Sequence, residues 1–166
     1  TVTSEGQGII QSIRKLILET CSVEQVAKMF GITIEAALDV LYGDTDSVMI
    51  LALLSSIEEA YKLGKALEKY INKTLLTLAP LEIQYEKVYR NYMLFGKKRY
   101  AGIYCIEGKA PFLKATGIET IRRDFTPMTT RVQQMALETM LGVYDPTGKF
   151  TPNPEGALQY TRGEIA

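Results

Sequence analysis

The segment LDVLYGDTDSVMILAL, residues 38–53, decides the fold of this chain. Two apolar runs, 38–42 and 48–53, flank the short polar stretch GDTDS. Segments of this kind, separated by Gly, Asp and Ser, are typical of an antiparallel hairpin with a tight turn. The sequence therefore predicts a two-stranded hairpin whose turn carries Asp44 and Asp46.

The two aspartates of this turn are candidate metal ligands. Residues two apart in extended geometry lie on one face, so both carboxylates can project toward one point. Neighbouring anions repel each other, and a divalent cation relieves that repulsion. Ligand sets made only of oxygen favour Mg²⁺ or Mn²⁺ over softer metals. The alternative is a solvated turn, because Gly and Asp are common turn residues.

The remaining pattern predicts further helices and strands around this hairpin. Ser55 and Glu58 form a capping box that opens one of the helices. Residues 145–163 are rich in Pro, Gly, Asn and Thr, and we expect a loop there. The order of elements indicates an α+β fold with an antiparallel sheet flanked by helices. Helices are predicted over 4–20, 22–30, 55–76 and 127–141, and strands over 81–89, 92–95, 99–106 and 112–115.

Composition excludes several kinds of chemistry. The 166 residues contain no histidine, which excludes zinc sites built on His, Ser-His-Asp hydrolysis and Cys-His proteolysis. The two cysteines, Cys21 and Cys105, are too far apart for a metal motif, and we expect buried thiols in a reducing, intracellular compartment. There is neither a run of 18 apolar residues nor a signal-peptide pattern, so we expect no membrane span. Because the first residue is Thr, we expect a piece of a longer or processed chain.

Four segments, in order along the chain, resemble signature segments of the family B DNA polymerases. They are TVTSEGQGII at 1–10, YGDTDS at 42–47, YEKVYRNYMLFGKKRYAG at 85–102 and GIETIRRD at 117–124. The resemblance implies that residues 1–124 form the C-terminal part of a polymerase palm, with 1–20 as the helix that returns from the fingers. Residues 125–166 would then begin a helical thumb with a loop-rich tail.

The resemblance also assigns roles around the acidic turn. Asp46 would be the direct ligand of two Mg²⁺ ions, with Mn²⁺ as a substitute, and Asp44 would be a supporting carboxylate. Glu86 lies where the family often has a carboxylate near the metals, although a plain exposed strand Glu is an equal alternative. The residues expected to shape the turn or give polar support are Tyr42, Gly43, Thr45 and Ser47.

Basic residues downstream are expected to hold primer–template DNA. The family's KKRY motif corresponds to Lys97, Lys98, Arg99 and Tyr100. In a strand, Lys98 and Tyr100 would share one face and Lys97 and Arg99 the other. Their contacts to phosphate and sugar would be independent of sequence, as a polymerase requires.

Two further features of the resemblance concern the segment around residue 117. Arg122 and Arg123 would add phosphate contacts farther along the duplex. The residue before GIET is Thr116, where the family commonly has Lys, so one backbone contact would be weaker here.

The site predicted from the sequence is incomplete. We find no DxxSLYPS-type segment (motif A), no KxxxNSxYG-type fingers helix that binds the deoxynucleoside triphosphate, and no proofreading exonuclease motif. We therefore expect activity only together with another segment or chain, with a processivity factor as a further candidate partner and the nucleus or a viral replication site as the location. Two alternatives are a non-catalytic remnant that binds duplex nucleic acid or scaffolds a replication complex, and an unrelated α+β domain with an acidic turn.

Overall fold

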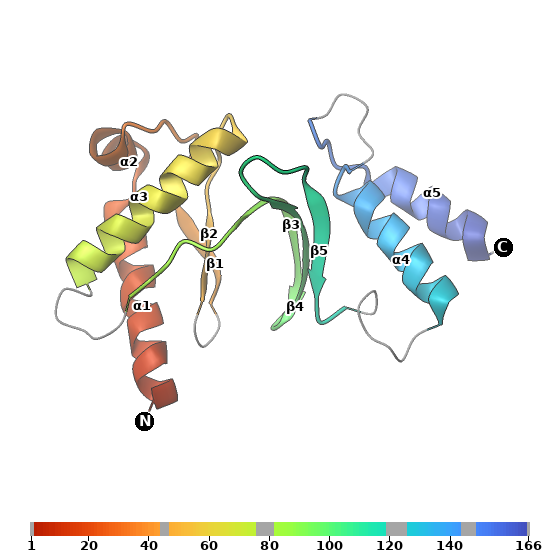
Figure 1. The fold of residues 1–166 in the computed structure, drawn as a ribbon, viewed down its shortest axis with the longest axis horizontal. Helices are drawn as coiled ribbons and strands as arrows, with labels where there is room; N and C mark the ends of the chain where they lie inside the picture. Colours follow the sequence, from red (N-terminus) through yellow and green to blue (C-terminus); the bar gives the residue numbers. More distant parts are fainter. Residues whose placement is uncertain (1, 44–46, 76–81, 119–125, 144–148, 166) are drawn as a thin grey trace. The chain divides into compact units, whose positions relative to one another are not determined.

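The computed structural model describes residues 2–43, 47–75, 82–118, 126–143 and 149–165 (Figure 1). This part of the chain contains five helices and two small antiparallel sheets, which confirms the predicted α+β class. The strands form two separate sheets, where one was expected. The chain divides into two compact units, residues 1–86 and 87–166, and each is described by itself.

The first unit begins with two helices, α1 (Val2–Thr20) and α2 (Val23–Phe30). Ser22 caps α2: its hydroxyl accepts a hydrogen bond from Gln25 N, and the Gln25 side chain accepts one from Ser22 N. Gly31 ends α2 in the left-handed conformation, with φ of 67°. A residue with a Cβ adopts that conformation only at a cost, so glycine is favoured there.

The predicted hairpin is present as β1 (Asp39–Gly43) and β2 (Val48–Leu51). The strands are antiparallel, with Val40 opposite Ile50 and Gly43 opposite Val48. One extra residue, Leu41, forms a bulge in β1. Residues 44–47 therefore connect the two strands at one end of this hairpin.

The third helix, α3 (Ile57–Leu75), completes the first unit. It begins one residue later than predicted: Ser56 Oγ accepts from Glu59 N, and Ser55 Oγ donates to the Glu59 carboxylate. The capping hydroxyl is therefore that of Ser56 and its partner is Glu59, in place of the predicted Ser55 and Glu58.

Side chains from α1, α2, α3 and the segment 31–38 form one common core. Val40 and Ile50 of the hairpin pack against it from one face. Each fully buried aliphatic side chain contributes about 1.5–3 kcal/mol relative to exposure. The buried members are Ile13, Ile17, Cys21, Val26, Ile32, Ile34, Leu38, Leu63, Leu67 and Ile71.

The second unit contains a three-stranded antiparallel sheet in the order β3-β4-β5 (Figure 1). Its strands are β3 (Val88–Gly96), β4 (Arg99–Cys105) and β5 (Phe112–Thr116). Strand β3 begins at Val88, so the strand predicted over 81–89 is wrong for residues 82–87, which belong to no strand. Side chains of α3 bond to that segment instead.

Two helices follow the sheet, α4 (Pro127–Met140) and α5 (Pro154–Ile165). The loop predicted over 145–163 is wrong for residues 154–163, which lie in α5. The Asn and Pro residues that suggested a loop in fact start this helix: Asn153 Oδ1 accepts a hydrogen bond from Gly156 N, and Pro154 is the first helical residue.

Asn91 of β3 connects the sheet to the segment that follows α4. Its Nδ2 donates to the carbonyl oxygens of Leu141 and Phe150, both at 2.7 Å. The guanidinium of Arg90 lies 4.9 Å from the centre of the Phe150 ring.

No described helix is long and apolar enough to cross a membrane. The predicted division into palm and thumb at residue 124 lies among residues outside the description, and it stays a prediction.

Candidate functional site

The hairpin of the first unit contains the residues on either side of the two aspartates. Asp44, Thr45 and Asp46 lie outside the described residues, as does the side chain of Tyr42. Gly43, the last residue of β1, lies close to Ile10 of α1, because a Cβ at this position would lie 3.1 Å from Ile10 Cγ2. Ser47 is half-buried and directly precedes β2. The described residues thus fix where the YGDTDS segment leaves and rejoins the hairpin.

The KKRY motif adopts a different local structure from the one predicted. Lys97 and Lys98 form the two-residue turn between β3 and β4, and β4 begins at Arg99. The prediction that both lysines lie in a strand, on alternate faces, is therefore wrong. The physical reason is the pairing of Gly96 with Arg99, which leaves only two residues to reverse the chain.

Lys98 holds the left-handed conformation, with φ of 58°. Such backbone is rare for a residue with a Cβ and costs roughly 1–2 kcal/mol. Gly117 lies directly beside this turn, because a Cβ on Gly117 would overlap the carbonyl oxygen of Lys98. Gly117 itself has φ of 65°. Gly117 therefore packs against the turn formed by Lys97 and Lys98.

The sheet of the second unit has one buried face and one aromatic face. Ala101, Ile103 and Cys105 alternate on the buried face of β4. Tyr100 and Tyr104 lie on the other face, and the sequence reading did not find the cluster that they join there. Its ring centres are 5.2–6.4 Å apart in consecutive pairs, and its members are Tyr89, Tyr92, Tyr100, Tyr104 and Phe112.

Gly102 is the residue that makes room for this aromatic face. A Cβ at Gly102 would lie 2.7 Å from Tyr89 Cδ1 and 3.1 Å from Tyr92 Cδ2. The two rings therefore cover the backbone of β4 at this glycine. A glycine inside a strand is a sign of such close approach, and that signal was available from the sequence. The cationic Nζ of Lys114 lies 4.8 Å from the centre of the Tyr104 ring, so the face is both aromatic and basic.

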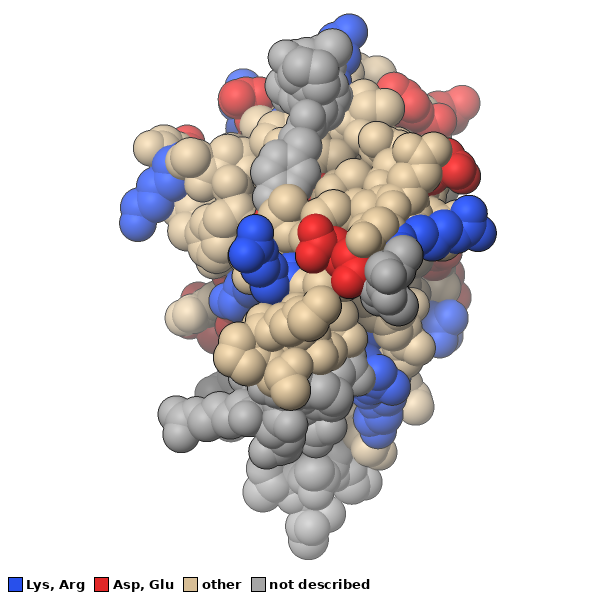
Figure 2. Space-filling view, turned by 90° about the vertical axis from the view of Figure 1, so that its right-hand side faces the viewer, with Lys and Arg blue, Asp and Glu red and all other residues tan. Residues whose placement is uncertain are grey.

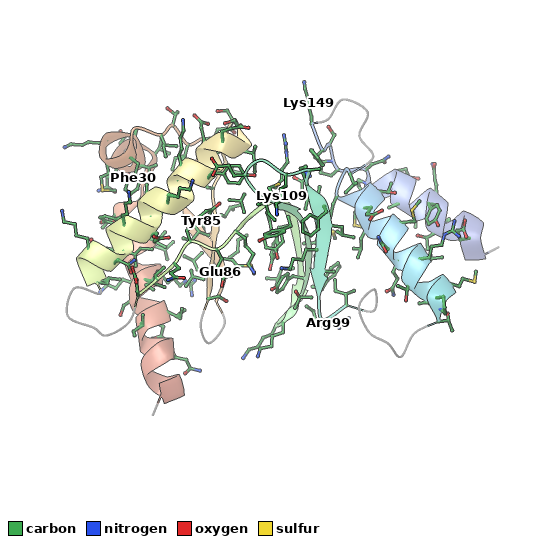
Figure 3. All side chains as sticks on the ribbon, viewed as in Figure 1. Phe30, Tyr85, Glu86, Arg99, Lys109 and Lys149 are labelled. Carbon is green, nitrogen blue, oxygen red and sulfur yellow. The ribbon has the colours of Figure 1, made fainter. Side chains whose placement is uncertain are left out.

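The other predicted site residues are not brought to one point by the described structure. Glu86 is exposed and follows Tyr85 in the segment before β3, outside any strand (Figure 3). Arg122 and Arg123 lie outside the described residues. Among the residues that the structure does describe, no group of three or more Cys, Asp and Glu could hold a metal ion.

Charge is segregated between the two units. Residues 1–86 carry 7 Lys and Arg against 12 Asp and Glu, and residues 87–166 carry 12 against 7. Within residues 87–118 there are seven basic residues and one acidic residue. Figure 2 shows one face of the molecule on which Lys and Arg side chains are separated by tan and grey surface. Basic residues are therefore not gathered into one patch in this view.

Both cysteines are buried and unoxidised, as predicted. Burial raises the pKa of the Cys21 thiol above its usual value, and a hydrogen bond with Thr20 acts weakly in the opposite direction. Burial also raises the pKa of Cys105, against a backbone hydrogen bond and the charge of Arg90. Neutral, buried thiols are poor nucleophiles and poor metal ligands.

Comparison with known proteins shows the family of the chain. The model of DNA polymerase family B matches residues 1–163, so the chain belongs to that family and the predicted resemblance is confirmed.

Individual relatives are DNA polymerase delta catalytic subunits. The protein from Plasmodium falciparum is 39% identical over 127 residues, covering 76% of this chain and 11% of that protein. The proteins from rice and from Schizosaccharomyces pombe are each 34% identical over 167 residues, covering 100% of this chain and 14% of theirs. The chain thus spans a small fraction of the length of these relatives.

Proposed function

We propose that this chain forms part of a template-directed DNA polymerase that adds deoxynucleotides to the 3′ end of a primer. The observation that carries the proposal is that two paired strands flank the segment with both aspartates, in a chain of family B. Gly43 lies opposite Val48, so the segment with both aspartates connects two paired strands. A strand-held turn suits a metal site, which needs its ligands at fixed positions.

Asp46, supported by Asp44, would hold divalent cations at this turn. Their only donors are carboxylate oxygens, which fit Mg²⁺ and also Mn²⁺. When bound, a pair of such ions supplies activation of the attacking 3′-hydroxyl and neutralisation of the leaving pyrophosphate. Tyr42, Gly43, Thr45 and Ser47 would shape the turn. Glu86 is a weaker candidate ligand, placed at the end of the same unit.

The second unit would hold the primer–template duplex. Lys97 and Lys98 lie at a hairpin turn, where long cationic side chains can reach phosphates without rearranging the sheet. Arg99 and Tyr100 follow on the central strand, and Arg122 and Arg123 are proposed to extend the contact. The excess of basic residues in this unit supports that role, because counterion release drives sequence-independent binding to DNA.

Activity is proposed to require further segments, in the same chain or in another. These would supply motif A, the fingers that bind the nucleotide and an exonuclease, with a processivity factor as an added partner. Leu41 and Leu51 of the hairpin and Leu53 just after it are 44%, 38% and 46% exposed, which favours a neighbouring segment that covers them. By analogy with the polymerase delta subunits of eukaryotes, the nucleus is the proposed location.

The proposal is tested in the complete enzyme by Asp46→Ala. Loss of a metal ligand removes several kcal/mol of transition-state stabilisation, so the single-turnover rate should fall about 10³-fold or more. Duplex affinity should change little. Asp39→Asn is the matched control, because Asp39 is an exposed carboxylate at the far end of the same hairpin and should leave the rate unchanged.

The second candidate function is a non-catalytic subunit that binds duplex DNA, which the basic second unit also favours. The two are separated by the same experiment. A duplex-binding subunit would lose nothing measurable with Asp46→Ala, whereas a polymerase would lose nucleotide addition.

A further inference from the structure

The segment that leads from the first unit to the second is bound along α3 by side chains. Residues 82–87 belong to no strand. Three residues of α3 meet this segment at spacings of four, Gly64, Glu68 and Asn72, and these share one face of the helix. Figure 3 labels Tyr85, whose ring lies against α3 at Gly64.

Asn72 satisfies both backbone groups of Ile83. Its Nδ2 donates to the Ile83 carbonyl oxygen at 2.8 Å, and its Oδ1 accepts from Ile83 N at 2.8 Å. One side-chain amide thus makes the pair of bonds that a neighbouring strand would make. The Ile83 side chain also packs against the core of the first unit.

Glu68 and Gly64 hold the next residue that faces the helix, Tyr85. Glu68 Oε2 accepts a hydrogen bond from Tyr85 N at 2.6 Å, a charge-assisted bond of the stronger kind. A Cβ on Gly64 would overlap the Tyr85 ring, so the ring packs directly on the helix backbone.

The spacing explains why a helix can bind an extended segment in this way. Four helical residues advance about 6 Å, and two extended residues advance about 6.8 Å. Asn72 and Glu68 therefore match Ile83 and Tyr85 with little strain, running antiparallel. Together these contacts define a tether, Gly64, Glu68 and Asn72 with Ile83 and Tyr85.

We propose that this tether fixes the point at which the chain leaves the first unit, that nucleotide addition depends on this fixed exit, and that Glu68 and Asn72 are positioning residues of the polymerase. The inference rests on the proposed function. The tether ends one residue before the boundary between units at Glu86 and Lys87. Without it, a flexible segment of six residues, 82–87, would allow a spread of about 13 Å in the position of its end. A misplacement of about 1 Å is enough to slow a positioned reaction by 10²-fold.

The test uses the complete polymerase with Glu68→Ala and Asn72→Ala, measured in a pre-steady-state burst. Each variant should lower the burst rate about tenfold or more, while the affinity for primer–template changes less than about twofold. Amide exchange at Ile83 and Tyr85 should accelerate in the same variants. Glu68→Gln keeps an acceptor oxygen for Tyr85 N and should restore the rate. Gly64→Ala should lower the rate independently, by displacing the Tyr85 ring.

Controls separate positioning from folding and from the proposed function. Lys69→Ala lies on the exposed side of the same helix and should behave as the wild type. A reduced burst amplitude at an unchanged rate would show a structural role only and overturn the inference, as would an unchanged rate with accelerated amide exchange. The proposed function stands or falls separately, on Asp46→Ala in the otherwise unaltered enzyme.

Discussion

Replacing the turn residue Lys98 by Gly should keep or slightly raise stability and weaken DNA binding, and the same change at its neighbour Lys97 provides a matched control. Both residues occupy the two-residue turn between β3 and β4, but only Lys98 has positive φ, at 58°. Replacing either by Gly removes one positive charge and adds the same freedom to the unfolded chain. The two variants therefore differ in the backbone conformation that the glycine takes up in the folded state.

The expected difference follows from the left-handed conformation. Lys98→Gly relieves a strain of about 1–2 kcal/mol, whereas Lys97→Gly relieves none. Gly also costs roughly 0.5–1 kcal/mol in unfolded-state entropy in both variants, and this contribution cancels in the comparison. Lys98→Gly should thus be more stable than Lys97→Gly by about 1–2 kcal/mol, and equal to or slightly more stable than the wild type.

Two assays check this reasoning. Urea denaturation gives the difference in unfolding free energy between the variants, with unchanged m-values as the control for the denatured state. Duplex binding at several salt concentrations gives the slope of log K against log salt, which should fall by about 0.9 for each lost phosphate contact. Equal stability of the two variants would refute the strain argument, and an unchanged slope for both would refute their contact with phosphate.

Three further perturbations test other parts of the structure. Gly102→Ala should destabilise the second unit by about 1–3 kcal/mol, because its Cβ would displace the Tyr89 ring, and a lower urea midpoint would show it. Thr116→Lys adds a cation opposite Tyr100 in the sheet; it should tighten duplex binding and steepen the salt slope by about 1, and a weaker complex would contradict the assignment of this edge to DNA. The folded-state pKa of Cys21 and of Cys105 is raised above the ordinary value of 9.0. The contribution of these thiols to stability is therefore complete below about pH 9 and is lost as the pH rises through the folded pKa. The unfolding free energy from urea denaturation should be lower at pH 10 than at pH 8, and replacing either cysteine by Ala should make this difference smaller.

The sequence was informative wherever a local pattern decides the structure. The β1–β2 hairpin follows from apolar runs around GDTDS. The start of α2 follows from Ser22 and its end from Gly31, which act through neighbouring backbone groups. The family resemblance rests on such local motifs, and it was confirmed. The positions of the acidic turn residues stay predictions, because they lie outside the described residues.

The sequence was misleading where the partner of a segment lies far along the chain. Residues 82–87 have the alternation of a strand, but Asn72 and Glu68 supply their hydrogen bonds from a helix. Two polar residues four apart on α3 would be the only local sign of this. The turn at Lys98 lies against the glycine at position 117, and no local rule of sequence predicts this contact.

The central claim is that Asp46 serves nucleotide addition, and single-turnover extension of a primed template tests it most directly. In the complete enzyme with saturating deoxynucleotide and Mg²⁺, Asp46→Ala should extend the primer about 10³-fold more slowly than the wild type, with duplex affinity retained. Asp39→Asn should match the wild type. An Asp46→Ala enzyme that extended the primer at near wild-type rate would contradict the assignment of the catalytic turn.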